Sequence, residues 1–141
     1  MICFAVVGEG PTDYGREVYD KGKGGYRWEE GPIFPMIRRT AEKAGHKIVL
    51  QAVDKKEVYK IRTQRNASKL RGLKGKANDS ARFSLYLSMH RYSYGIFYCD
   101  ADKEAGKKNT DRHTCEYRFA QVRGEVLEGH RAAGTSDVKL V

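Results

Sequence analysis

Acidic side chains follow two apolar runs of the sequence, at the point where each run ends. Glu9 comes shortly after residues 2–7, and Asp100-Ala101-Asp102 comes directly after residues 94–99. Carboxylate oxygens are hard ligands that suit Mg²⁺ or Mn²⁺, and three carboxylates in one crevice would repel one another without a cation. A divalent cation at such a place polarises a phosphate and lowers the pKa of a bound water. The residue types therefore predict a metal site formed by Glu9, Asp100 and Asp102.

Two further acidic residues lie close to these motifs. Asp13 and Glu104 are secondary candidates for the same site: a helix or turn cap is the favoured role for Asp13, and an exposed helix position explains Glu104 as well as a metal role does. Taken alone, the Asp100-x-Asp102 spacing is also typical of a solvated turn. Glu9 after an independent apolar run is what favours the metal site.

The alternation of apolar segments predicts the elements that position these carboxylates. Buried or half-buried strands are expected at residues 2–7, 46–53, 94–99 and 138–141. Helical periodicity is expected at residues 32–45, from about 81 to 90, and at 114–127. Strands that alternate with helices predict one α/β domain over residues 1–141, with a mainly parallel four-stranded sheet and helices on both faces. In such sheets ligands bind at the carboxyl ends of strands, where both acidic motifs fall.

Two segments do not follow this alternation. Residues 14–31 hold five of the glycines, so we expect a loop or insertion from which Tyr26 and Trp28 fold back onto the core. Residues 60–78 carry no acidic side chain and form a basic segment, which is more often a solvated face but beside a phosphodiester site favours contact with backbone phosphates. Its cations are Lys60, Arg62, Arg65, Lys69, Arg71, Lys74 and Lys76.

The composition limits the partners. The chain of 141 residues has a formal net charge of +9, which favours a polyanion such as DNA or RNA. No apolar run approaches the roughly 18 residues of a membrane span, so no membrane partner is expected. The first apolar run lacks a basic n-region and is interpreted as a strand and not as a signal peptide, which predicts a cytoplasmic protein.

The two acidic motifs together resemble those of the TOPRIM superfamily, which includes primases, topoisomerases and nucleases. The matching segments are Gly8-Glu9-Gly10-Pro11-Thr12-Asp13 and Asp100-Ala101-Asp102-Lys103-Glu104-Ala105-Gly106, each after an apolar strand. The first segment is most similar in form to OLD-like and stand-alone TOPRIM nucleases. The resemblance implies a TOPRIM-like (Rossmann-like) fold, an acid/base or metal role for Glu9, and Mg²⁺ or Mn²⁺ held by Asp100 and Asp102.

The chain also departs from the family. The insertion at residues 14–31 separates the first motif from its helix, and neither a zinc-binding domain nor a second domain with a tyrosine nucleophile is visible. By elimination we expect a Mg²⁺-dependent nuclease or nuclease-like domain acting on DNA or RNA. Cations after the second motif would neutralise the transition-state charge; they are Lys103, Lys107 and Lys108.

Other functions remain open on the same residues. A non-catalytic module that binds nucleic acid or protein within a larger TOPRIM system is the main alternative. A partner subunit or a further C-terminal segment would then supply catalysis, and an ending on or just after the last strand is compatible with a fragment. Gly8-Glu9-Gly10 also begins like a dinucleotide fingerprint, but Asp13 stands where the third glycine belongs. The Asp-x-Asp motif of nucleotide-sugar glycosyltransferases needs a larger domain than this one.

Overall fold

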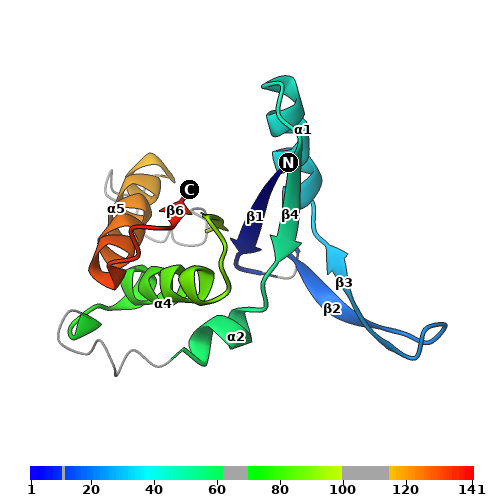
Figure 1. Cartoon of the computed structure of the whole chain (residues 1–141), viewed down its shortest axis with the longest axis horizontal. Helices are drawn as coiled ribbons and strands as arrows, with labels where there is room; N and C mark the ends of the chain where they lie inside the picture. The colour runs from blue at the N-terminus through cyan, green and yellow to red at the C-terminus, as the bar shows by residue number, and fades with distance from the viewer. Residues whose placement is uncertain (11, 62–69, 100–114) are drawn as a thin grey trace.

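The main sheet consists of four parallel strands. The computed structural model describes residues 1–10, 12–61, 70–99 and 115–141 (Figure 1). In spatial order the strands are β4 (Ile48–Ala52), β1 (Ile2–Val7), β5 (Tyr94–Phe97) and β6 (Lys139–Leu140). The prediction of an α/β protein with a parallel four-stranded sheet is therefore confirmed.

The side chains of β1 alternate between the two faces of this sheet, as a strand requires. Ala5 and Val7 pack with Phe83 and Leu87 of α4 (Gly75–Met89), and α2 (Lys55–Tyr59) adds to the same core cluster. On the opposite face, Val6 packs with residues of α1 (Ile33–Lys43). Helices thus cover both faces. None of the helices in the described part of the chain is long and apolar enough to cross a membrane.

Helix α5 (Cys115–Ala133) packs against α4 through small and neutral polar residues. A Cβ atom added to Gly129 would lie 1.9 Å from the Ala77 carbonyl oxygen, so the two backbones approach too closely for any side chain there. Ser80 Oγ donates a hydrogen bond of 2.6 Å to the Val126 carbonyl. This close packing places α4 as a fixed support between α5 and the sheet.

The glycine-rich segment is an antiparallel β-hairpin and not a loop. Its strands are β2 (Gly15–Asp20) and β3 (Gly25–Glu30), and the hairpin projects away from the main sheet (Figure 1). Tyr19 and Tyr26 face each other across it, with ring centroids 5.2 Å apart, and such cross-strand aromatic pairs stabilise a hairpin. Trp28 packs on the core as expected. Tyr26 does not, because it is 72% exposed.

Element boundaries agree with the sequence to within a few residues, with three differences. Helix α5 continues past residue 127 to Ala133, and α4 begins at Gly75, earlier than the apolar pattern suggested. Helix α2 was not predicted at all. It is short, and the Asp54 carboxylate caps it by accepting a 2.9 Å hydrogen bond from the Lys56 N–H group.

Candidate functional site

The carboxyl ends of β1 and β5 meet at a topological switch point. From β1 the chain first crosses to β4 on one side, then returns to β5 on the other side of β1. The pairing continues beyond the strands, since the Tyr98 N–H group donates a 2.9 Å hydrogen bond to the Val7 carbonyl. Ligands of open α/β sheets bind in the crevice outside such a point, and Glu9 follows β1 there.

Gly8 allows the chain to reach Glu9 between two tyrosine rings. A Cβ atom at Gly8 would lie 2.9 Å from a ring carbon of Tyr14 and 3.1 Å from one of Tyr98. Any larger residue would push these rings apart. The backbone of the Glu9 loop is therefore fixed by aromatic packing on both sides.

Tyr14 ties the end of β1 to the end of β4. Its buried hydroxyl lies 2.5 Å from the Val6 carbonyl oxygen and 2.7 Å from that of Val53, and it accepts a 2.9 Å hydrogen bond from the Val53 N–H group. Burial raises the pKa of the Tyr14 phenol, so the group stays neutral and its role is structural. Sequence reasoning missed this residue because it stood at the start of a presumed loop.

Glu9 is held by two lysines from two different helices. Lys76 Nζ, in the first turn of α4, forms an ion pair with Glu9 Oε1, and Lys55 Nζ, at the start of α2, lies 3.8 Å from the same oxygen. The side chains of Glu9 and Lys76 are only 17% and 16% exposed. We call these three residues the Glu9 cluster. A carboxylate so far removed from water requires a nearby cation, which Lys76 supplies.

A small pocket beside the Glu9 cluster contains a second carboxylate. Its polar lining includes Glu9, Lys55 and Asp79, while Val58 and Phe97 contribute apolar wall. Asp79 comes from the second turn of α4. Sequence reasoning did not select Asp79 or Lys55, because only the folding of α2 and α4 against the strand ends brings them to Glu9.

The positive charge of the Glu9 cluster extends to the end of β5. Burial raises the pKa of the Cys99 thiol, while the amines of Lys76 and Lys55 act to lower it and the Asp79 carboxylate acts to raise it. Lys76, Lys55 and Asp79 therefore each lie within electrostatic range of the Cys99 thiol. Cys99 immediately precedes the second acidic motif in the sequence.

The predicted metal ligands are only partly within the described chain. Asp100, Asp102 and Glu104 lie outside it, and the residues within it form no group of three or more histidine, cysteine or acidic side chains that could hold a metal ion. Glu9 and Asp79 are hard oxygen donors and so fit Mg²⁺ or Mn²⁺ in kind. They are too few to hold the ion alone, so a site would need Asp100 and Asp102 as well.

Asp13 lies at the base of the hairpin. Its carbonyl oxygen accepts a 3.2 Å hydrogen bond from the Ile33 N–H group at the start of α1, and Gly31 packs against the same carbonyl. The main chain of Asp13, and not its carboxylate, thus caps the helix. Asp13 is not among the described residues that line the Glu9 pocket.

The basic segment is only partly described, and its described cations differ in their surroundings. Lys76 belongs to the Glu9 cluster, and Lys60 Nζ pairs with Glu57 at 2.7 Å. Arg71 and Lys74 are exposed. The other predicted nucleic-acid contacts lie outside the described residues; they are Arg62, Arg65, Lys69, Lys103 and Lys107, together with Lys108.

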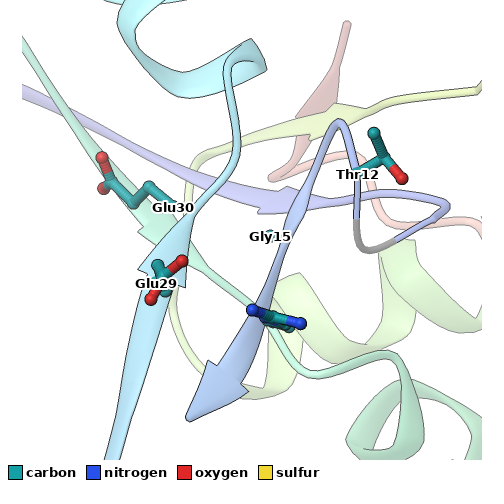
Figure 2. A pocket seen from close by; sticks show the side chains of 5 residues that line it. Thr12, Gly15, Glu29 and Glu30 are labelled. Atoms are coloured by element: carbon teal, nitrogen blue, oxygen red, sulfur yellow. The ribbon is translucent and has the colours of Figure 1, made fainter.

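A second pocket lies at the base of the hairpin, and both of its described carboxylates form ion pairs. Figure 2 shows Thr12, Gly15, Glu29 and Glu30 around it. Arg38 binds Glu30 through two 2.6 Å hydrogen bonds, which hold the pKa of that carboxyl below its ordinary value. Arg27 lies 3.8 Å from Glu29. Glu29 and Glu30 are 51% and 37% exposed, against 17% for Glu9, and both belong to the hairpin and not to a strand end of the main sheet, so the Glu9 cluster is the better candidate for chemistry.

Comparison of this chain with protein-family models, curated proteins and solved structures gives no match. Function is therefore inferred from the geometry of the Glu9 cluster and from the resemblance of the two acidic motifs to those of the TOPRIM superfamily.

Proposed function

We propose that this protein is a metal-dependent nuclease of TOPRIM-like architecture that acts on DNA or RNA in the cytoplasm. The observation that carries the proposal is the position of Glu9. It is a mostly buried carboxylate at the carboxyl end of β1, beside the end of β5, with two lysine amines on one of its oxygens. A carboxylate and cations at a switch point suit a ligand that brings both phosphate and metal.

The proposed ion is Mg²⁺ or Mn²⁺, held by Glu9, Asp100 and Asp102, and it would supply Lewis acidity at the phosphate. Glu9 would also accept a proton from the attacking water or complete the coordination. Lys55 and Lys76 lie close enough to Glu9 to bind the non-bridging oxygens of the same phosphate. Exposed cations such as Arg71 and Lys74 would contact neighbouring phosphates, without reading sequence.

A cleavage assay tests the proposal. Labelled single- and double-stranded DNA and RNA are incubated with Mg²⁺, Mn²⁺ or EDTA and the full chain, its Glu9→Gln and Asp102→Asn variants, and Glu42→Gln. Glu42 is an exposed glutamate on α1 and serves as the control for loss of one carboxylate. We expect metal-dependent cleavage by the wild type and by Glu42→Gln, and loss of cleavage in the other two variants. Undiminished cleavage by Glu9→Gln would contradict the proposal.

A non-catalytic binding module is the second candidate function. It is favoured by the ion pair between Glu9 and Lys76, which satisfies the carboxylate without a metal. Under this alternative, nucleic acid or a partner protein binds the basic surface, and a partner subunit or further C-terminal segment supplies catalysis. Nucleic-acid binding that is the same with EDTA and with Mg²⁺, without cleavage of any substrate, would favour the module.

A further inference from the structure

The ion pair between Glu9 and Lys76 joins segments that are far apart in the sequence. Lys76 is a residue of the basic segment, yet its amine does not face outward like the neighbouring Lys74; it is 16% exposed and contacts Glu9 Oε1. Lys55 approaches the same oxygen at 3.8 Å. Glu9 therefore has its countercharge within the protein.

A lysine side chain can readily leave an ion pair of this kind. Its ammonium is a compact point charge on a flexible stem, so it can leave a carboxylate without movement of the backbone. A divalent cation bound to Glu9 would repel an ammonium at contact distance, and that repulsion is strong away from bulk water. Lys76 and a divalent cation therefore compete for contact with the Glu9 carboxylate.

The released amine would still lie beside a favourable place for an anion. Lys76 belongs to the first turn of α4, where backbone N–H groups lack intrahelical partners, and the N-cap residue Lys74 makes no side-chain cap with the residues described. Lys55 stands on the adjacent α2, and its amine lies 3.8 Å from the same Glu9 oxygen that the Lys76 amine contacts. A phosphate between α2 and α4 would face both lysines.

We propose that Lys76 is an exchangeable counter-cation for Glu9: it holds the carboxylate in the free protein, a divalent cation displaces it, and its amine then binds a phosphate of the nucleic acid. The inference rests on the proposed function, because it takes Glu9 as a metal ligand. It adds that metal and nucleic acid bind cooperatively, each raising the affinity for the other by the same factor.

Titration calorimetry with Mn²⁺ alone tests the first step. The full chain is compared with Lys76→Ala, with Glu9→Gln and with the control Lys74→Ala, which removes an exposed lysine two positions away. Removing the competing amine should tighten Mn²⁺ binding on the order of tenfold, whereas Lys74→Ala should bind as the wild type does. Lys76→Arg, which keeps the charge, should bind no tighter than the wild type, and circular dichroism checks that each variant folds.

The outcomes separate the inference from the proposed function. If Lys76→Ala binds Mn²⁺ no tighter than the wild type, while Glu9→Gln abolishes binding, Lys76 does not compete with the metal ion. Glu9 would in that case still be a metal ligand, and the proposed function would be unaffected. If Glu9→Gln binds Mn²⁺ as the wild type does, or if the wild type binds none, both ideas fail. Tightening in Lys76→Arg equal to that in Lys76→Ala would also overturn the exchange, because the charge would then not be the cause.

Fluorescence anisotropy with a phosphorothioate oligonucleotide tests the second step. We expect Mn²⁺ to raise the affinity of the wild type by about fivefold or more, and Lys76→Ala to lose this gain. Lys74→Ala should lower the affinity by the same factor with and without Mn²⁺. An equal gain in Lys76→Ala and the wild type would show that Lys76 does not move to the phosphate.

Discussion

Among the polar contacts of helix α4, those near its start and those near its middle differ in charge and in exchangeability. In its first turn, Lys76 pairs with Glu9 at the end of the sheet. Farther along, Ser80 and Ser84 make neutral hydrogen bonds to α5, the second of them 2.8 Å long between Ser84 Oγ and His130 Nδ1. The charged contact joins a helix to a loop, while the neutral contacts join two packed helices.

The difference shows which contact serves stability. A neutral hydrogen bond between fixed neighbours needs no further partner, and its loss leaves a buried polar group unsatisfied. A partly buried ion pair adds little to stability, because desolvation offsets most of the attraction. The charged contact is therefore the one that can be exchanged for a ligand, and substitutions at the two places should have opposite consequences.

The largest effect is expected on activity. Glu9→Gln should lower metal-dependent cleavage by roughly 100-fold or more, the usual scale for loss of an acid/base group. Its free energy of unfolding should change by less than about 1 kcal/mol, because glutamine keeps the size of the side chain and an oxygen that accepts a hydrogen bond from the Lys76 amine. Cleavage rates and urea unfolding of the same preparation measure both. A large loss of stability with an unchanged cleavage rate would show that the ion pair between Glu9 and Lys76 serves the fold and not the activity.

Next in size is the effect of Gly129→Ala on stability. The new methyl group would overlap the Ala77 carbonyl and force α5 away from α4, at a cost of about 2–3 kcal/mol. Gly124→Ala is the matched control, because it lies on the same helix with nothing within 4 Å of the new atom. That control should stabilise the protein by about 0.5–1 kcal/mol through helix propensity. Urea unfolding distinguishes the two, and equal changes would refute the close packing.

A smaller effect is expected for Ser84→Ala. The substitution leaves His130 Nδ1 without its partner and should reduce the free energy of unfolding by about 1 kcal/mol, with metal-dependent cleavage unchanged. Ser136→Ala, at an exposed serine after α5, should have no measurable effect. Thermal unfolding and the cleavage assay together provide the measurement. Loss of cleavage in Ser84→Ala would mean that the residues of α4 that contact α5 also contribute to activity.

The smallest effect concerns pH. Burial lowers the pKa of His130 below its ordinary value of about 6.5, so the folded protein favours the neutral ring. As the pH falls below about 6.5 the unfolded chain takes up a proton before the folded one does, and stability declines until the folded pKa is passed. His130→Gln should remove this part of the pH dependence in urea unfolding between pH 7 and 5. An unchanged profile would show that His130 is not responsible.

Most of the fold could be predicted from apolar periodicity. The strands of the main sheet and helices α1 and α4 bury apolar side chains in the two core clusters, and the sequence shows that pattern directly. The hairpin could not be predicted in this way, because its strands are largely solvent-exposed and hold charged residues and glycines. Its signal is the cross-strand pairing of Tyr19 with Tyr26, which becomes visible only once a turn is assumed.

The candidate site was predictable in part for a different reason. Glu9 could be selected because it directly follows a buried strand, and strand ends are where α/β sheets bind ligands. Lys55 and Asp79 could not, since their place depends on how α2 and α4 pack over the strand ends. The metal role of Asp100 and Asp102 remains a prediction.

The side chain of Tyr14 connects the hairpin to the Glu9 loop. The Tyr14 ring contacts Trp28 of β3, at a centroid distance of 5.0 Å, and its Cδ2 atom is the nearest neighbour that a Cβ on Gly8 would meet. The Tyr14 ring therefore lies between the hairpin and the loop that carries Glu9. A shift of Trp28 in the hairpin would thus press the Tyr14 ring against Gly8, the residue that precedes Glu9.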